Sequence, residues 1–258
     1  MNRITALAAT VALTAGSLAL ATPTQAAPAR AYKVTAKANI DTAIAKEDVV
    51  KVRGRVTPKA AGQKVILQQR VGNKKKWTST GNAKVKKNGT YLLKDKPTTP
   101  GSREYRVLKP GAKGITKGWS KPVQVQVYRW EKLSQRNTGP FENVIPSGVT
   151  IGTDYYGNSL LSNVSGTPGY AEYTLGRKCV SLSATYALAD SSVSGSSGAV
   201  TVTTDGELQK VHSLAVGTIV ADDVVDLTGV YRLRFDLSTT ATPAAVAAVA
   251  TPMVLCTR

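Results

Sequence analysis

The side chains that most often carry catalysis are scarce in this chain of 258 residues. It has one histidine, His212, and two cysteines, Cys179 and Cys256. A zinc site built from histidine and cysteine, or a haem held by two histidines, is therefore excluded. A serine triad would need His212 as its base. That residue lies in a run with strand character, and residues 195–198 lack the G-x-S-x-G nucleophile elbow.

Carboxylates offer two further chemistries. A glycosidase needs two carboxylates at a defined separation, and the spacing of the acids in residues 131–258 marks no such pair. Asp222, Asp223 and Asp226 could offer oxygens to a calcium ion, although an exposed acidic turn is the favoured interpretation. We expect no enzymatic activity, no cofactor and no metal site.

Positive charge is the most prominent chemical feature, because 34 Lys and Arg stand against 16 Asp and Glu. Such a surplus concentrates polyanions near the surface, although lysines can also serve solubility alone. The lysines expected at outward strand positions and hairpin tips are the candidate polyanion-binding residues: Lys74, Lys75, Lys76, Lys84, Lys86 and Lys87. A nucleic-acid ligand is not expected. Proteins that bind single-stranded nucleic acid usually have aromatic rings for base stacking interleaved with their cations. Trp77 and Tyr91 instead occupy strand positions where a sandwich normally buries an aromatic residue.

The first 26 residues have the pattern of a secretory signal peptide. A short basic start with Arg3 precedes an apolar run over residues 4–21, and the small residues Thr24 and Ala26 suit cleavage after Ala26. We therefore expect a secreted, extracellular protein whose mature form has no transmembrane anchor.

Export changes the interpretation of the two cysteines, because thiols outside the cytosol are not kept reduced. We predict that Cys179 and Cys256 form a structural disulfide. The bridge would close a long loop, for which loop entropy gives roughly 4–5 kcal/mol of stabilisation.

Charge divides the chain into two parts. Residues 31–130 carry 24 Lys and Arg against 5 acids, whereas residues 131–258 carry 8 against 11. A change of this size indicates two modules with different surfaces. We expect a basic domain over 27–128 and a second domain over 129–258.

The first module has the pattern of an immunoglobulin-like β-sandwich. Short runs such as 49–56 alternate apolar with polar residues, and turn signals such as Asn88 with Gly89 separate them. The most characteristic positions are 52–69, Lys76 and Trp77, 88–91, Pro100 and Gly101, and 105–107. In these positions the module resembles the immunoglobulin-like or fibronectin-like repeats of secreted bacterial proteins. The resemblance implies a spacer or an adhesive role.

The second module is also expected to be an all-β sandwich. Strand-like runs such as 198–204 are rich in Gly, Ser, Thr and Val, and Asp205 with Gly206 has the chemistry of a tight hairpin turn. The one helix that the pattern predicts is short and covers residues 244–250.

Seven segments of this module follow one another in a characteristic order: 128–133, 149–152, 171–176, 179–185, 198–206, 224–229 and 231–236. The order is similar to that of bacterial carbohydrate-binding modules with a galactose-binding-like jelly-roll fold. The resemblance implies a jelly-roll that binds a glycan. Residues 242–252 depart from that family, because they carry no charge where the family has an acidic segment.

Sugar binding generally needs a concave site with a few fixed polar groups, and aromatic rings lie against the C–H faces of the sugar. The candidate glycan-binding residues are Tyr155, Tyr156, Asn158, Tyr170 and Tyr173. Packing inside the sandwich is the alternative for about half of them.

These observations predict a secreted, non-catalytic protein that binds carbohydrate or the cell envelope. The jelly-roll would bind a glycan, and the basic domain would contact an anionic cell-wall polymer. The expected partners are therefore extracellular polysaccharide or anionic wall polymer, and we expect a monomer. The alternative is an extracellular structural or protein-interaction scaffold without glycan specificity.

Overall fold

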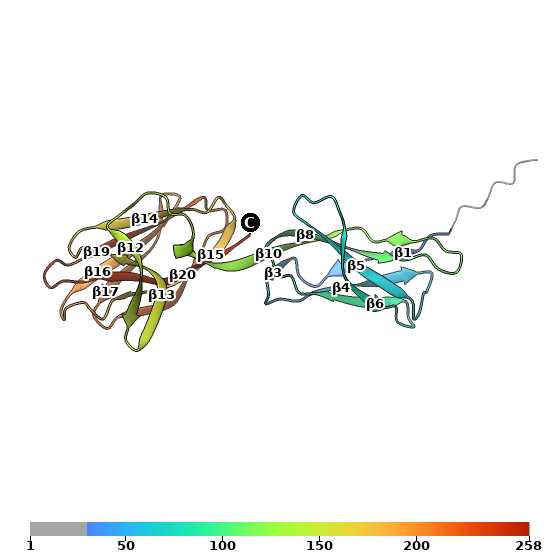
Figure 1. Ribbon diagram of the computed structural model, residues 1–258, viewed down its shortest axis with the longest axis horizontal. Coiled ribbons are helices and arrows are strands. Elements are labelled where there is room, and N and C mark those ends of the chain that lie inside the picture. Colours follow the sequence, from blue (N-terminus) through green and yellow to red (C-terminus); the bar gives the residue numbers. More distant parts are fainter. Residues whose placement is uncertain (1–29, 258) are drawn as a thin grey trace, which may run out of the picture.

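A computed structural model describes residues 30–257, and it confirms the all-β fold expected from the sequence (Figure 1). Within these residues the helical structure is confined to one short 3-10 turn, η1 (Leu133–Gln135). No helix in the described part is long and apolar enough to span a membrane. The signal peptide predicted over residues 1–26 lies outside the described residues.

Ten strands make up the first sandwich and its connection to the second. They are β1 (Lys33–Val34), β2 (Lys37–Ala38), β3 (Thr42–Ile44), β4 (Val50–Thr57), β5 (Lys64–Val71), β6 (Thr78–Lys84), β7 (Thr90–Asp95), β8 (Gly101–Lys109), β9 (Gly118–Trp119) and β10 (Val123–Lys132). One sheet is formed by β1, β4, β2 and β7. The other has the order β10-β8-β5-β6, with β3 beside β10 and β9 beside β8.

Alternation along the strands explains how the two sheets face each other. In β4, Val50, Val52 and Val56 are buried, whereas Lys51 and Arg53 are exposed. Side chains of a strand point alternately to the two faces of its sheet, so one face of β4 fills the core and the other carries charge.

Gly54 marks a point where β4 passes very close to a neighbouring segment. A Cβ atom at Gly54 would lie 1.7 Å from the carbonyl oxygen of Thr35. The hydroxyl of the buried Tyr91 donates a hydrogen bond to the same carbonyl. Glycine is therefore required at this position by contact distance.

Ten further strands form the second sandwich. They are β11 (Phe141–Glu142), β12 (Val144–Ile151), β13 (Asp154–Ser162), β14 (Gly169–Thr174), β15 (Cys179–Leu188), β16 (Ser197–Thr204), β17 (Glu207–Ala215), β18 (Ile219–Asp226), β19 (Arg232–Thr239) and β20 (Ala247–Cys256). A five-stranded sheet has the order β11-β14-β19-β16-β17. In the facing sheet β20 pairs with both β13 and β15, and these pair in turn with β12 and β18.

The helix predicted over residues 244–250 is wrong, because most of this segment belongs to β20. Both faces of the strand are covered. Ala247 and Val249 belong to the main core of the sandwich, while Ala248 and Ala250 pack into a smaller cluster with residues of β12 and β13. A strand buried on both faces loses its alternating pattern, so its run of alanine and valine resembles a helix.

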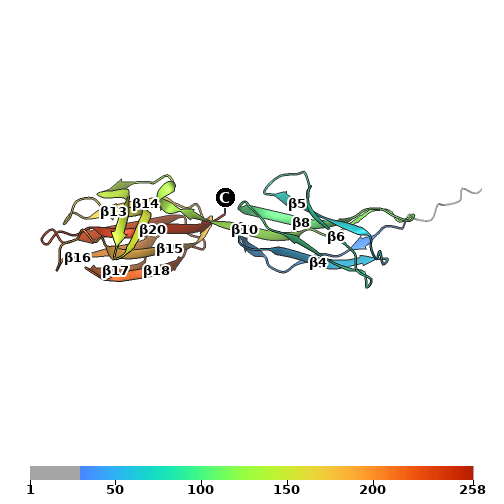
Figure 2. The ribbon, with the colours of Figure 1, turned by 60° about the horizontal axis from the view of Figure 1, so that its bottom comes forward.

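One strand belongs to both sandwiches. The first half of β10 pairs with β8, from Val123 to Val127, and the second half pairs with β20, from Arg129 to Lys132. The side-chain amide of Gln126 also donates a hydrogen bond to the hydroxyl of Thr257. Figure 2 shows β10 running from one sandwich into the other without an intervening loop.

Candidate functional site

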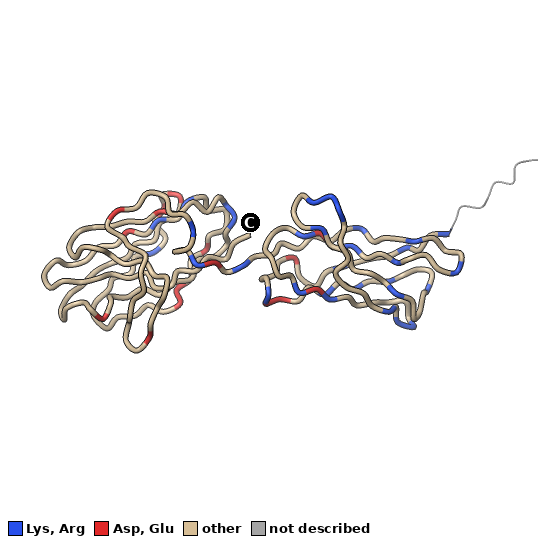
Figure 3. The backbone as a smooth tube through the Cα atoms, in the orientation of Figure 1, with Lys and Arg blue, Asp and Glu red and all other residues tan. Residues whose placement is uncertain are grey.

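The six candidate polyanion-binding lysines are all exposed, but the structure separates them into two groups. Lys74, Lys75 and Lys76 lie in the loop between β5 and β6, and Lys84, Lys86 and Lys87 lie at or just beyond the far end of β6. The strand between them rises roughly 20 Å. Basic residues are dense over the first sandwich, and blue segments mark its opposite ends (Figure 3). A single ligand that contacts all six lysines would have to span that distance.

The first lysine group adjoins Trp77, a tryptophan that reaches the protein surface. Trp77 is partly exposed, so the expectation that it is buried in the core is wrong, whereas Tyr91 is buried as expected. The guanidinium carbons of Arg106 and Arg70 lie 4.2 and 4.9 Å from the ring centre of Trp77. These contacts are cation–π interactions, in which the cation lies over the aromatic ring.

Trp119 continues the same arrangement on β9. The residue is 43% exposed. The guanidinium of Arg106 lies 5.8 Å from its ring centre, and the ammonium of Lys117 lies 5.2 Å from it. Arg106 therefore contacts both indoles. We call Arg70, Trp77, Arg106, Lys117 and Trp119 the Trp–Arg face.

The sheet register positions these side chains. Tyr105 and Val107 of β8 point into the core, so Arg106 between them points outward. Its guanidinium donates a hydrogen bond of 2.9 Å to the side-chain oxygen of Gln68, which lies opposite it on β5. Desolvation lowers the pKa of Arg106, and the nearby charge of Arg70 adds to this effect. The group stays cationic, because arginine is not deprotonated in proteins.

Arg70 forms an ion pair with Glu104, its cross-strand neighbour on β8. The hydrogen bond from Arg70 lowers the pKa of the Glu104 carboxyl and raises that of Arg70 itself. A hollow of about 390 Å³ opens beside this pair, and Lys74 and Lys75 line it together with Gln124 of β10. Cationic, acidic and amide groups thus meet at one end of the Trp–Arg face.

Gly118 holds β9 close enough for Trp119 to reach Arg106. A Cβ atom at Gly118 would lie 1.8 Å from the carbonyl oxygen of Tyr32. Any larger residue would push β9 away from that segment. The tight packing of Gly118 therefore fixes the position of the neighbouring indole.

The structure does not bring the five candidate glycan-binding residues into one site. Tyr155, Tyr156 and Asn158 lie on β13, and the side chain of Tyr155 is 74% exposed. Tyr170 is partly exposed on β14. Tyr173 is 1% exposed and belongs to the core, so its role as a glycan contact is a wrong prediction. Tyr170 and Tyr173 are three positions apart on one strand, so they point to opposite faces of the sheet.

Tyr170 lies in a charged cluster on the outer face of the five-stranded sheet. The guanidinium carbon of Arg234 is 4.0 Å from its ring centre. Arg234 also pairs with Glu172 at 3.0 Å and with Asp236 at 2.6 Å, which raises the pKa of the arginine. Two hollows of about 350 and 400 Å³ are both lined by Arg234. We call Tyr170, Glu172, Arg234 and Asp236 the Arg234 cluster.

Motifs do not reveal the Arg234 cluster, but the alternation along β19 carries a signal for it. In β19, Leu233, Phe235 and Leu237 are buried, so Arg234 and Asp236 project together from the other face. Alternation alone predicts that pair. Their contact with β14 depends on the sheet register, which alternation does not give.

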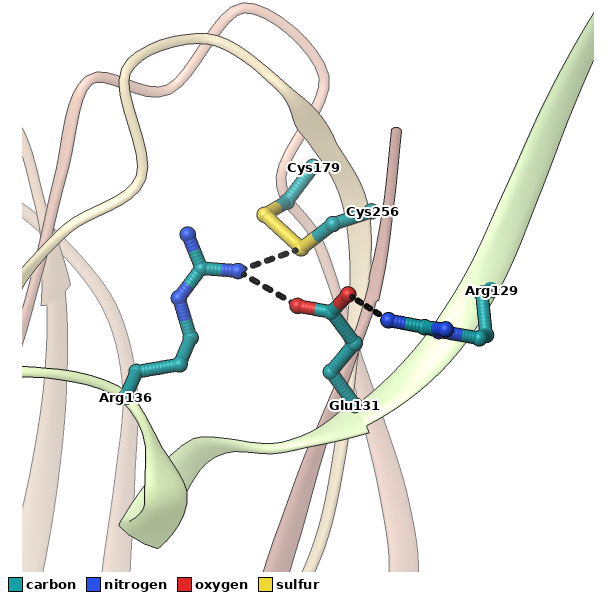
Figure 4. Close-up of a disulfide and its surroundings, with 5 residues drawn as sticks. All are labelled: Arg129, Glu131, Arg136, Cys179 and Cys256. Carbon is teal, nitrogen blue, oxygen red and sulfur yellow. Dashed lines mark hydrogen bonds and ion pairs between the residues drawn. A yellow bond between two sulfur atoms is a disulfide. The ribbon is translucent and has the colours of Figure 1, made fainter. Parts of the chain in front are cut away.

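The predicted disulfide between Cys179 and Cys256 is confirmed (Figure 4). The two cysteines are register partners on β15 and β20, with Cα atoms 3.9 Å apart. Arg136 donates a hydrogen bond of 3.4 Å to the sulfur of Cys256 and pairs with Glu131 at 3.0 Å. Glu131 also pairs with Arg129 on β10, so charged side chains surround the bridge where the two sandwiches meet.

His212 lies inside the second sandwich. It is 8% exposed, its ring stacks on Tyr186 with centres 4.0 Å apart, and its Nε2 lies 3.4 Å from a carboxylate oxygen of Asp223. Burial lowers the pKa of His212, although the charge of Asp223 opposes that shift. The environment therefore favours the neutral, packed form of this histidine.

The acidic turn predicted around Asp222, Asp223 and Asp226 is wrong in its local structure, because all three lie in β18. Asp223 forms an ion pair with Lys210, and Asp226 accepts a hydrogen bond from the backbone of Thr228. Across residues 30–257 no three or more His, Cys, Asp and Glu side chains converge in a way that could hold a metal ion.

Neither a scan against protein-family models nor a search of curated proteins finds a match to this chain.

Proposed function

We propose that this protein is a secreted, non-catalytic binding protein whose first sandwich attaches it to an anionic polymer of the cell envelope. The observation that carries the proposal is the Trp–Arg face, where Arg70, Arg106 and Lys117 surround two indoles. Lys74 and Lys75 extend the positive charge into the adjoining hollow. A cluster of cations attracts a polyanion over a longer range than a single cation does.

The distribution of charge supports this assignment. Residues 31–130 carry nearly five times as many basic as acidic residues, whereas the second sandwich has a slight acidic excess. A polyanion is therefore directed to the first sandwich. Retention should weaken at high ionic strength, because salt screens contacts between exposed charges.

The experiment is retention of the full chain on cell walls, before and after extraction of the anionic wall polymers, at about 50 and about 500 mM salt. We expect salt-sensitive retention that disappears when the anionic polymers are removed. Equal retention on extracted walls would overturn the proposal. It would favour the scaffold hypothesis if retention then required a protein component of the wall.

The two lysine groups provide a matched pair of variants. Replacing Lys74, Lys75 and Lys76 by Gln should strongly weaken retention, because this group adjoins the Trp–Arg face. Replacing Lys84, Lys86 and Lys87 by Gln removes the same charge at the far end of β6 and should have a smaller effect. Equal losses in both variants would mean that net charge acts without a defined site.

A second candidate function, glycan binding by the second sandwich, is favoured by the hollows on both sides of Arg234. A tyrosine ring beside carboxylates and a guanidinium offers a stacking surface and hydrogen-bonding groups for sugar hydroxyls. Tyr170→Ala should then reduce salt-resistant retention on walls from which anionic polymers have been extracted. Leu208→Ala serves as the control, because Leu208 is an exposed apolar residue on β17 that lines neither hollow.

A further inference from the structure

We propose that the Trp–Arg face selects an acidic polysaccharide, a polymer whose negative groups are carried on sugar rings. This inference rests on the binding function proposed above and specifies its ligand. Attraction to charge alone would need only lysine and arginine. The structure instead places two surface indoles among the cations, at Trp77 and Trp119.

Trp119 exposes much of its surface to water. Large apolar surface in contact with water is unfavourable, and a ligand that covers it gains free energy. The pyranose ring offers an apolar C–H face that can cover an indole. A polymer with a flexible, ringless backbone, such as a polyol phosphate, has no such face and would gain only from the charges.

Indole rings and cations alternate along the Trp–Arg face. Arg106 contacts Trp77 at 4.2 Å and Trp119 at 5.8 Å, so a cation lies between the two rings. Lys117 and Arg70 provide further cations at the two outer sides. A polymer with a carboxylate on each successive sugar can place its sugar rings against the indoles and its carboxylates against the cations.

Nucleic acid is the competing ligand, because its bases can also stack on indoles. The carboxylate of Glu104 and the amides of Gln68 and Gln124 lie beside the cations of the face. Sugar hydroxyls both donate and accept hydrogen bonds, so they can use all of these groups. A phosphodiester backbone only accepts hydrogen bonds, so it can use the amide donors but not the carboxylate of Glu104.

The extent of the face suits a chain rather than a single sugar. The contacts follow β8 from Leu108, the register partner of Trp119, through Arg106 to Glu104, the partner of Arg70. The hollow lined by Lys74 and Lys75 then continues the strip toward the β5–β6 loop. Several sugar units in a row fit along this path.

The test compares two polycarboxylates that differ in their rings. The full chain is titrated with polygalacturonate and with poly-L-glutamate of similar length, at one salt concentration, with tryptophan fluorescence and calorimetry as readouts. We expect roughly tenfold tighter binding of polygalacturonate, equivalent to one stacking contact. Its binding should also change the tryptophan emission more strongly. Single-stranded oligo(dT) is the third ligand and should bind more weakly than polygalacturonate.

Trp119→Ala provides the decisive variant, because its exposed side chain can be removed without opening the core. It should lower affinity for polygalacturonate roughly tenfold and leave affinity for poly-L-glutamate within about twofold. Leu92→Ala is the control, since Leu92 is a similarly exposed apolar residue on β7 in the other sheet.

The outcomes separate this inference from the function on which it rests. Equal binding of the two polycarboxylates, or equal loss of both in Trp119→Ala, overturns the selection for sugar rings and leaves polyanion binding intact. Binding of oligo(dT) as tight as that of polygalacturonate assigns the face to nucleic acid and also overturns the inference. Absence of binding to all three polymers overturns both proposals.

Discussion

The guanidinium carbon of Arg106 lies 4.2 Å from the ring centre of Trp77, and a hydrogen bond to Gln68 holds it there. Cation–π contacts at exposed sites contribute about 0.5–1 kcal/mol. Arg106→Gln should therefore change the fluorescence of Trp77 and weaken binding of an anionic polymer. Arg53→Gln removes an equal charge from an exposed position on β4 and should do neither. Equal weakening in the two variants would contradict a local role for Arg106.

The disulfide should make a large contribution to stability, because Cys179 and Cys256 join two central strands over a long loop. The double variant Cys179→Ala, Cys256→Ala should lose about 2–5 kcal/mol of unfolding free energy. Urea denaturation measures the loss. Reductant should lower the stability of the parent protein and leave the double variant unaffected, and a similar response in both would contradict this prediction.

Gly54→Ala should destabilise the first sandwich, because the new methyl group would lie 1.7 Å from the carbonyl oxygen of Thr35. Overpacking of this kind costs about 1–3 kcal/mol. Gly81→Ala is the control, since its nearest contact would be an ordinary 3.4 Å. That variant should stay within about 0.5 kcal/mol of the parent protein. Thermal or urea unfolding compares the two, and equal stabilities would contradict the expected clash.

His212 should make stability depend on pH. Burial lowers its folded-state pKa below the ordinary value of 6.5, so the unfolded chain takes up a proton first as the pH falls. The stabilisation is therefore complete above about pH 6.5 and is lost as the pH falls toward the lowered folded-state pKa. His212→Phe should flatten the dependence of unfolding free energy on pH in that window. His212 is the one histidine of the chain, so an unchanged profile in the variant would assign the dependence to carboxyl groups.

Local alternation accounts for the parts of the fold that could be predicted. It identifies β4 from Val50 to Thr57, and it places Tyr170 and Tyr173 on opposite faces of β14. The disulfide followed from the cysteine count and the expected compartment. These features depend on residue type and spacing along a single segment.

The features that could not be predicted depend on contacts between distant segments. Residues 244–250 have a helix-like pattern although four of them begin β20, because β12, β13 and the main core cover both faces of that strand. The Trp–Arg face exists because register places Gln68 opposite Arg106, and Trp119 opposite Leu108. Register is set by the whole sheet, so the sequence of one strand does not reveal which cation meets which ring.

The strand shared by the two sandwiches has a mechanical consequence. β10 is antiparallel both to β8 and to β20, and backbone hydrogen bonds of such ladders run perpendicular to the strands. A tension that pulls the sandwiches apart along β10 therefore acts across these hydrogen bonds and loads several of them together. Because the disulfide ties β20 to β15 at the same end, that load passes into the second sandwich through a covalent link. The junction can therefore transmit force from one sandwich to the other.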